Sequence, residues 1–448
     1  MKNIAERIAE YVDAAGGRTF YVGGFVRDRL MGQDNKDVDI EVHGVQPGDL
    51  RGILSKVGEP LEFGRSFGVF ALKGEDIDIA MPRRERATGS GHRDFDVEVD
   101  PFLGTEKAAR RRDFTINSMM EDILSGEIID HFGGRRDLEA GVIRHIDAES
   151  FVEDPLRVLR GAQFAARFGF TIADETVELC RGIDISTLSR ERVEEELKKA
   201  LLKADRPSIF FESLRGMDQL GVWFPELERL IGLEQDPVFH PEGDVWVHTM
   251  EVTDRAAALR DRSPEPYAFM LLALCHDLGK IVTTEEVKGR IHAYEHETKG
   301  MPLVESLVRR ITGEKDVIDY VLNMVPLHMR PNIAAYSKPA LKSTNRLFDA
   351  AAVPGDLIWF AEADKPVFSG TDEFSGDSAF LQERLRAYEE TMSRPHIMGR
   401  DLIEAGLEPG EDFGEILAYA HKLRLAGIDK DAAMKQVLSY ARKMKKGR

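Results

Sequence analysis

Residues 21–42 read YVGGFVRDRLMGQDNKDVDIEV: a β-prone run that ends in two glycines, a short helical run, and a second β-prone run. Alternate side chains of a strand point to the same face, so we expect Asp37 and Asp39 to project together while Val38 and Ile40 turn into the core. Two carboxylates at this spacing suit a divalent metal ion, typically Mg²⁺ in phosphate chemistry. The pattern predicts a metal site on a strand.

The glycine pair before the helical run predicts a second part of that site. Gly23 and Gly24 let the backbone approach a phosphate group without a Cβ in the way. The N-terminus of the following helix favours anions, and Arg27 lies in its first turn, where it could reach a triphosphate. Strand, glycine turn, helix and paired aspartates together predict a cradle for a triphosphate and its metal ion.

Other β-prone runs in the first part of the chain predict the rest of the sheet. A third carboxylate is usual at a two-metal site. Asp78 is the candidate, but Asp76 shares its face and Glu41 is also near, so the choice stays open. Helical connections between the runs indicate one mixed sheet. The runs are TFYVGG at 19–24, FGVFALKG at 67–74, DIDIAM at 76–81 and GEIIDHFGG at 126–134.

After Asp154 the strand signals largely stop and helical periodicity takes over. DPLRVLRGAQFAARFGF, ERVEEELKKALL and SIFFESLRGMDQLGVW continue as amphipathic helices. The predicted fold class is therefore α+β: a head with a small mixed β-sheet and helices, followed by all-α segments.

The composition favours a cytoplasmic protein. The chain of 448 residues has no apolar run long enough to span a membrane, and its start lacks the apolar core of a signal peptide. Its two cysteines, Cys180 and Cys275, cannot form a disulfide framework. The net charge of −18 argues against a general nucleic-acid coat, while clusters of arginine leave a local phosphate-binding patch open.

Several blocks resemble, in order, those of the class II tRNA nucleotidyltransferase (CCA-adding enzyme) and bacterial poly(A) polymerase family. They are GGFVRD with DVDIEV, RRDFTINSM at 111–119, EDPLRVLRGAQFAARFGF at 153–170 and ERVEEEL at 191–197. The resemblance implies a tRNA partner and the addition of CMP, CMP and AMP to its 3′ end, with CTP and ATP as donors and Mg²⁺ as cofactor.

The resemblance also implies roles for single residues. Asp37 and Asp39 would be the catalytic pair that holds Mg²⁺. Glu153, Asp154 and Arg157 would act as a protein template for the Watson–Crick edge of the incoming base. The positions that would bind the nucleotide are Gly23, Gly24, Arg27, Arg112, Asn117, Asp154, Arg157 and Arg160.

The template role makes chemical sense for these residue types. Aspartate offers acceptors and arginine a planar fork of donors, and a spacing of three on a helix puts Asp154 and Arg157 on one face. Cytosine and adenine each combine a donor with acceptors, whereas guanine and uracil present an incompatible edge. One pair of side chains could therefore accept C and A only.

Two further stretches bear on which member of the family this is. PRRERATGSGHRDFDVEVDP, at 82–101, resembles the mobile loop that helps such enzymes switch from C to A addition; His92 and Arg93 are part of its polar content. FGRSFGVFAL, at 63–72, lacks the arginine-rich stretch associated with bacterial poly(A) polymerases. The second observation favours the tRNA enzyme, and an enzyme that adds only A stays open.

The later part of the chain carries histidines in an order that resembles the HD phosphohydrolase superfamily. Imidazole and carboxylate ligands suit a divalent ion, a transition metal among them. His296 and His328 could complete a second metal position. The predicted ligands, in VHTMEV, LCHDLGK and AEADKP, are His248, His276, Asp277 and Asp364.

The resemblances divide the chain into four predicted domains. They are a nucleotidyltransferase head (1–140), a helical neck with the nucleotide-selecting motif (141–235), an HD domain with phosphatase or 2′,3′-cyclic phosphodiesterase activity (236–390), and a helical tRNA-binding tail (391–448). No protein partner is implied.

Other functions stay open at this point. One alternative is an A-adding enzyme or a poly(A) polymerase. A second is an HD phosphohydrolase with a head that only binds RNA, and a third is a non-catalytic tRNA-binding protein. Alarmone synthetase/hydrolases also combine the two units but place the HD unit first, so the order in this chain counts against them.

Overall fold

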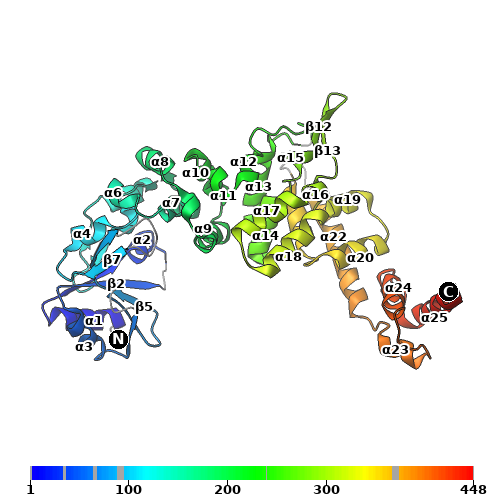
Figure 1. Cartoon of the computed structure of the whole chain (residues 1–448), viewed down its shortest axis with the longest axis horizontal. Coiled ribbons are helices and arrows are strands. Elements are labelled where there is room, and N and C mark those ends of the chain that lie inside the picture. Colours follow the sequence, from blue (N-terminus) through cyan, green and yellow to red (C-terminus); the bar gives the residue numbers. More distant parts are fainter. Residues whose placement is uncertain are drawn as a thin grey trace. The chain divides into compact units, whose positions relative to one another are not determined.

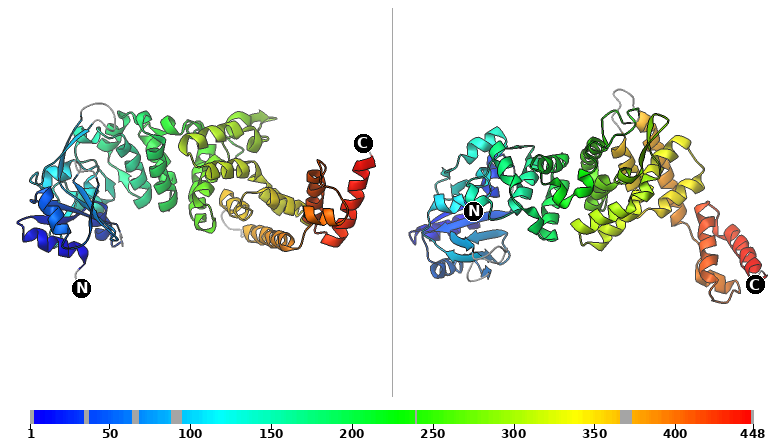
Figure 2. Two further views of the ribbon diagram at one scale, coloured as in Figure 1. Left: turned by 60° about the horizontal axis from the view of Figure 1, so that its bottom comes forward. Right: turned by 45° about the horizontal axis from the view of Figure 1, so that its top comes forward.

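A computed structural model of the chain describes residues 3–33, 37–63, 68–87, 95–238, 240–365 and 373–446. It contains two compact units. The first comprises Met1–Ala200 with Ile209–Val222, and the second comprises Leu201–Ser208 with Trp223–Arg448. Strands are concentrated in the N-terminal part of the chain, and helices dominate the rest (Figures 1 and 2).

The first unit is built on a seven-stranded mixed sheet with the strand order β3-β4-β5-β2-β1-β8-β9. Strands β2 and β5 are parallel, and the other neighbouring strands for which a pairing is described are antiparallel. This arrangement confirms the predicted α+β class. The strands are β1 (Arg18–Val22), β2 (Val38–His43), β3 (Pro60–Phe63), β4 (Val69–Leu72), β5 (Ile77–Ala80), β8 (Met120–Asp122) and β9 (Ile128–Ile129).

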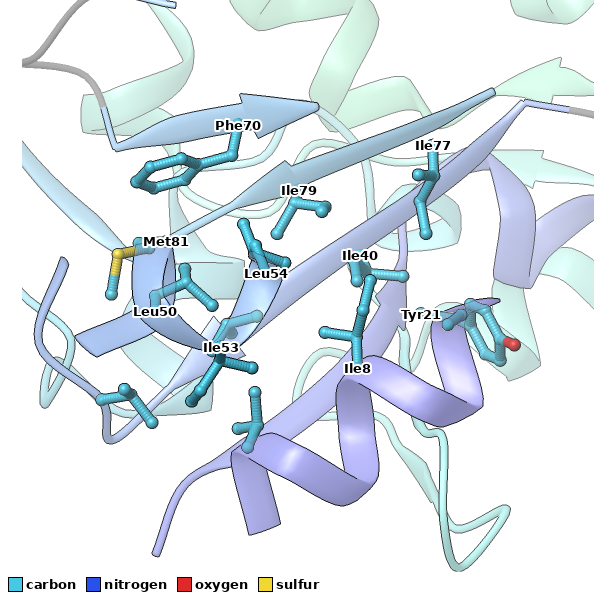
Figure 3. Packing of buried hydrophobic residues seen from close by; sticks show 14 of the residues in the cluster. Ile8, Tyr21, Ile40, Leu50, Ile53, Leu54, Phe70, Ile77, Ile79 and Met81 are labelled. Atoms are coloured by element: carbon cyan, nitrogen blue, oxygen red, sulfur yellow. The ribbon is translucent and has the colours of Figure 1, made fainter. Parts of the chain in front are cut away.

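Helices α1 (Ile4–Asp13) and α3 (Pro47–Leu54) pack on the sheet and form the core of the head. Ile8 of α1 lies beside Ile40 of β2, and Ile53 of α3 belongs to the same buried cluster (Figure 3). Full burial of one such side chain stabilises the fold by about 1.5–3 kcal/mol. Because Ile40 is held in this core, the alternate residues of β2, Asp39 among them, face the other side of the sheet.

Helices form the remainder of the first unit. Gly161 of α7 allows Phe114 to pack closely, because a Cβ at this position would lie 3.2 Å from the Phe114 ring. This packing holds α7 against the 111–119 block. The helices are α2 (Gly24–Leu30), α4 (Thr105–Arg110), α5 (Gly134–Ala140), α6 (Ala148–Phe151), α7 (Leu156–Phe168), α8 (Asp174–Arg181), α9 (Arg190–Lys203), α10 (Ser208–Gly216) and α11 (Leu220–Trp223).

The stretch predicted to be a loop, 82–101, is largely a β-ribbon. Strand β6 (Arg83–Ala87) pairs antiparallel with β7 (Phe95–Val99). In FDVEV, apolar and charged residues alternate with the period of a strand, a signal that the loop assignment passed over. The tip between the two strands, with His92 and Arg93, lies outside the described residues.

The second unit surrounds α14 (Pro266–Cys275), whose residues after the N-terminal proline are all buried. Helices α13 (Val245–Ala257), α18 (Lys315–Met324) and α21 (Asp356–Asp364) pack on it. A helix that is apolar on every side is typical of such a central position. The helix ends near this core carry the predicted HD ligands.

Further helices and a hairpin complete the described part of the second unit. The hairpin, β12 (Thr284–Val287) with β13 (Arg290–Ala293), adds strand to a region predicted to be helical. Its two-residue turn is favoured because Lys288 and Gly289 both have positive φ, 54° and 77°. The other helices are α12 (Pro225–Glu228), α15 (Lys280–Thr283), α16 (His296–Lys299), α17 (Met301–Ile311), α19 (Met329–Ser337), α20 (Leu341–Ala350), α22 (Glu373–Ser393), α23 (Gly399–Glu404), α24 (Phe413–Leu425) and α25 (Lys430–Lys446).

Another strand pair lies in the predicted helical neck, where β10 (Val142–Ile143) runs parallel to β11 (Thr171–Ile172). Among the described residues, no helix is both long enough and apolar enough to cross a membrane.

Candidate functional sites

A face of the head sheet gathers carboxylates. Parallel pairing of β2 with β5 sets Asp39 directly beside Asp78, and Asp37 precedes β2 by one residue. Burial raises the pKa of Asp39, and the carboxylates of Asp78 and Asp37 raise it further, against the lowering effect of Arg112. Like charges that crowd together in this way are balanced by a bound divalent cation. The donor set, carboxylate oxygens only, is the kind that Mg²⁺ prefers.

The glycine turn lies beside this face. Gly23 has φ 68°, and a Cβ on it would lie 2.9 Å from Nη1 of Arg112. Nη2 of Arg112 lies 3.4 Å from Oε2 of Glu41. Burial alone would raise the pKa of Glu41, but hydrogen bonds from His43 and Arg112 lower it. Glu41 is thus already paired with two cations or donors, which leaves Asp78 as the better third carboxylate.

Arg27 is buried rather than directed at solvent, with 3% of its surface exposed. Its Nε donates to Asp28 at 2.7 Å and its Nη1 donates to Oδ1 of Asn117 at 2.6 Å. The guanidinium lies over the ring of Phe168, 4.6 Å from its centroid. These contacts join α2 to the 111–119 block and to α7. Gly24 lies next to the Arg27 guanidinium, since a Cβ on Gly24 would be 3.3 Å from Nη2 of Arg27.

Asp113 links the predicted nucleotide contacts, a role that sequence reasoning missed. Its Oδ1 accepts from Nδ2 of Asn117 at 3.0 Å, and its Oδ2 accepts from Nε of Arg160 at 2.8 Å. Burial alone would raise the pKa of Asp113, but Arg160 and Asn117 outweigh it and lower the pKa. One chain of contacts therefore runs Arg27–Asn117–Asp113–Arg160. The signal was an acid inside the arginine-rich block RRDFTINSM.

The predicted template residues lie at the start of α7, where different partners orient them. Arg157 donates from Nη1 to the Ser150 carbonyl at 2.6 Å and from Nη2 to the Arg111 carbonyl at 2.7 Å. Asp154 accepts from Nη2 of Arg192 at 3.0 Å. The Glu153 carboxylate lies 3.5 Å from Nη2 of Arg111. Arg192 was not predicted as a site residue, although it belongs to the ERVEEEL block.

The HD histidines present a common arrangement of their ring nitrogens. In His276, His296 and His328, Nδ1 lies 2.8–2.9 Å from the backbone carbonyl three residues earlier. Because a carbonyl only accepts, each neutral ring carries its proton on Nδ1 and keeps a lone pair on Nε2. Nε2 of His296 and Nε2 of His328 face each other at 3.2 Å. Two such lone pairs repel, so the geometry suits a cation bound between them.

Two carboxylates, the buried Asp277 and the partly buried Asp364, complete the HD centre. Nε2 of His248 lies 3.2 Å from Oδ1 of Asp364. Nε2 of His276 lies 3.2 Å from Oδ2 of Asp277, whose other oxygen lies 3.2 Å from Nε2 of His296. Asp277 therefore faces both halves of the centre. The donor atoms form two groups that could each hold a metal ion: His248, His276 and Asp364, and Asp277, His296 and His328.

Close glycine packing holds this centre together. A Cβ on Gly279 would collide with the carbonyl of His296, and a Cβ on Gly300 would collide with Gly279 itself. The chain segment after Asp277 can therefore pass directly against the segment that carries His296. The structure thus brings together all the predicted HD ligands, including the two held for a second position.

Comparison with known protein families finds a match for the head and for the HD part of the chain. The model of the poly A polymerase head domain matches residues 19–144, and that of the HD domain matches residues 245–362. The multifunctional CCA protein of Alkalilimnicola ehrlichii is 35% identical over 404 residues, which cover 87% of this chain and 94% of that protein. The chain belongs to the multifunctional CCA protein family. The member from Cupriavidus pinatubonensis is 35% identical over 439 residues, 94% of this chain and 100% of that protein.

Solved structures agree with this family fold. A Thermotoga maritima CCA-adding enzyme complexed with tRNA superimposes with a TM-score of 0.64 at 23% identity, over 97% of this chain and 94% of that one. A CCA-adding enzyme complexed with ATP gives 0.66 at 23% identity, over 98% of this chain and 92% of that one. The predicted resemblance is confirmed at the level of family and fold. The roles of single site residues stay predictions.

Proposed function

We propose that the head adds CMP, CMP and AMP in turn to the 3′ end of tRNA, with CTP and ATP as donors and pyrophosphate as product. One observation carries the proposal: Asp37, Asp39 and Asp78 crowd together beside Arg112 and the Gly23 turn. Structural neighbours bound to tRNA, ATP and CTP support it, as does the name of the family. Such a reaction implies a cytoplasmic enzyme.

In this proposal the side chains divide the work on the triphosphate. Asp37 and Asp39 would hold Mg²⁺, with Asp78 as third carboxylate, and the ion would supply positive charge to the transferring phosphate when bound. Arg112 would contact the phosphates at the point where the Gly23 turn lets the backbone approach them. The tRNA 3′-hydroxyl oxygen bonds to the α-phosphorus, and the bond from that phosphorus to the bridging oxygen breaks. Gly24 and Arg160 are the other proposed nucleotide contacts; Arg27 and Asn117, predicted as direct contacts, are only 3% and 5% exposed and would instead hold the site in shape.

Base choice is assigned to the start of α7. Asp154 would present acceptors and Arg157 donors to the base edge, with Glu153 alongside. Each terminal nitrogen of Arg157 donates one N–H to a backbone carbonyl. These two hydrogen bonds fix the plane of the guanidinium and leave further N–H groups for the base. Arg192 orients the Asp154 carboxylate by a hydrogen bond from its own side chain. Preoriented donors and acceptors discriminate well because a mismatched base leaves them unpaired.

The test of the head is nucleotide addition by the purified protein with Mg²⁺. Three tRNA transcripts, ending before CCA, after C and after CC, would each receive labelled CTP, ATP, UTP or GTP. Addition of C, C and then a single A, lost in Asp37→Ala, supports the proposal. Addition of A alone to the CC-ended transcript would make this an A-adding enzyme, and long A tails a poly(A) polymerase. No incorporation would refute the nucleotidyltransferase function.

We propose a second activity for the HD part, a metal-dependent phosphohydrolase of the phosphatase or 2′,3′-cyclic phosphodiesterase type. The facing lone pairs of His296 and His328 and the two donor groups support it. Four imidazoles with two carboxylates suit a divalent transition metal, which would polarise a phosphoester when bound. The test is hydrolysis of a nucleoside 2′,3′-cyclic phosphate and of p-nitrophenyl phosphate with Mn²⁺, Co²⁺, Ni²⁺ or Mg²⁺. Absence of any His276-dependent hydrolysis would refute it.

The four predicted domains complete the proposal. We assign 1–140 to the catalytic head, 141–235 to the nucleotide-selecting neck, 236–390 to the HD domain and 391–448 to a tail that contacts tRNA. The tail helices α23, α24 and α25 share a small core of their own around Leu402, Ile416 and Val437.

A further inference from the structure

A buried carboxylate outside the predicted ligand set contacts the HD centre. Glu242 lies in the segment that precedes α13, with 7% of its side chain exposed. Its Oε1 lies 2.7 Å from Nδ1 of His248 and 3.0 Å from Nδ1 of His240. At these distances one carboxylate oxygen can accept a hydrogen bond from each of the two rings.

This contact decides which nitrogen of His248 faces the metal centre. With the Nδ1 proton held by Glu242, Nε2 keeps its lone pair, and that atom lies 3.2 Å from Oδ1 of Asp364. His276, His296 and His328 have Nδ1 held by backbone carbonyls. Of these four rings, His248 is the one whose Nδ1 hydrogen bond is made to a side chain; Oε2 of Glu297 also approaches Nδ1 of His296, but at 3.8 Å it is beyond hydrogen-bond distance. A carboxylate acceptor also makes the ring a stronger donor to a metal ion.

The segment that carries Glu242 is itself fixed in place. Gln235 donates from Nε2 to the carbonyls of Gly243 and Asp244, both at 3.2 Å. Its Oε1 accepts from Nζ of Lys280 at 2.9 Å, and the same nitrogen lies 2.7 Å from Oδ2 of Asp277. The backbone of this segment is thus connected to the HD centre through Gln235 and Lys280. Gln235 contacts both the segment and Lys280, and Lys280 contacts both Gln235 and Asp277.

The atoms of His240, Glu242 and His248 are also close enough to hold an ion of their own. That arrangement would require His248 to bind metal through both ring nitrogens, and so to lose both ring protons. A shared hydrogen-bond acceptor accounts for the same distances with neutral rings. The geometry therefore favours Glu242 as an anchor over a third metal position.

We propose that Glu242 is a positioning residue that sets the metal affinity of one half of the HD centre. It would act on the position formed by His248, His276 and Asp364 and leave the position formed by Asp277, His296 and His328 unchanged. The proposal rests on the proposed HD function and predicts a selective effect. Loss of a carboxylate that orients a ligand histidine lowers metal affinity about 10–100-fold.

The test uses the full chain carrying Asp37→Ala and Asp39→Ala, so that the head carboxylates do not bind the probe. Mn²⁺ alone is titrated by equilibrium dialysis, and the bound ions are examined by electron paramagnetic resonance. This background chain should bind two ions with a spin-coupled signal. Glu242→Ala should keep one tight ion, with an uncoupled six-line signal, and weaken the other about 10–100-fold.

Glu242→Gln separates orientation from a general loss of structure, because its amide oxygen still accepts from the rings. It should recover most of the affinity that Glu242→Ala loses. The matched control is Glu305→Gln on α17, an exposed acid that pairs with Arg309 and should bind both ions as the background does.

Three outcomes would overturn the inference. They are unchanged affinities in Glu242→Ala, an equal loss at both positions, or three tight ions in the background of which Glu242→Ala loses one. A background chain that binds no Mn²⁺ would refute the proposed HD metal centre itself, a result distinguishable from these three.

Discussion

Asp39 and Asp277 are both carboxylates assigned to metal ions, but the charges around them differ in sign. Asp39 has the carboxylates of Asp78 and Asp37 as neighbours, and its pKa is raised by burial and by that repulsion. Burial alone would also raise the pKa of Asp277, but Lys280 and His276 hold it well below the usual range. Negative charge therefore predominates around Asp39 in spite of Arg112, whereas Asp277 has the Lys280 ammonium 2.7 Å away.

Asp39→Asn should separate activity from stability. Loss of one carboxylate should lower the rate of nucleotide addition at least about 100-fold, because electrostatic stabilisation of the transferring phosphate is lost. The same change removes like-charge repulsion, so the thermal midpoint in the presence of a chelator should stay equal or rise. A variant that adds nucleotides at the normal rate would contradict the metal assignment.

Asp78 and Asp76 can be distinguished by the same addition assay. Pairing of β2 with β5 sets Asp78, not Asp76, beside Asp39. Asp78→Asn should lower kcat at least about tenfold and lower the pKa of Asp39, because a neighbouring negative charge is removed. Asp76→Asn is the matched control and should behave as the unmodified chain. The reverse ranking would move the third carboxylate to Asp76.

The Asp113–Arg160 pair should give pH-dependent stability. The folded-state pKa of Asp113 is lowered, so its stabilising effect is present above its unfolded pKa and is lost as the pH falls through the folded value. Asp113→Asn should cost about 3 kcal/mol at pH 7, since it leaves Arg160 without its carboxylate. The difference in the free energy of unfolding between the unmodified chain and Asp113→Asn should become smaller below pH ~4. If this difference does not change with pH, the charge of Asp113 contributes nothing to stability.

At the scale of elements, α7 and α9 hold the proposed base-selecting residues between them. The Asp154 carboxylate on the α7 side accepts from Arg192 of α9, and Arg157 is fixed by carbonyls from α6 and the 111–119 block. The proposed template thus depends on four chain segments, α6, α7, α9 and the 111–119 block, rather than on one helix face.

Arg192→Ala should therefore relax base choice more than it lowers the rate. With Asp154 less well oriented, the ratio of kcat/KM for CTP over UTP should fall about tenfold, because rejection of a wrong edge depends on fixed acceptors. Arg190→Ala, in the exposed first turn of the same helix, is the control. An unchanged ratio would show that Arg192 has no part in selection.

Sequence patterns predicted the elements better than the contacts between them. The i, i+2 aspartates, the glycine turn and the HD ligands were all visible as local spacing. Asp113 with Arg160, Asp154 with Arg192 and Asp277 with His296 are pairs between segments far apart in the chain, and periodicity carries no information on such pairs. The β6–β7 ribbon was not predicted, because RRERA of β6 has no alternation of apolar and polar residues and only FDVEV of β7 does.

At the scale of the whole molecule, the proposed activities lie in separate compact units with their own metal donors. His276→Ala should abolish hydrolysis and leave nucleotide addition within about twofold, because substitutions at sites that share no partners act separately. Chelation should lower the thermal midpoint of the second unit. Mn²⁺ at 100 times its Kd should restore about 2.7 kcal/mol. Loss of nucleotide addition in His276→Ala would mean that the two activities are coupled.

The backbone carbonyls that orient His276, His296 and His328 have a consequence for how the HD centre can vary. A main-chain acceptor is supplied by any residue, so no second amino acid has to be specified for these three rings to point correctly. Substitutions around them can accumulate without turning a ring. Only His248, among these four rings, depends for its orientation on the identity of another residue, and at Glu242 a single base change in the gene can alter the metal content of the protein.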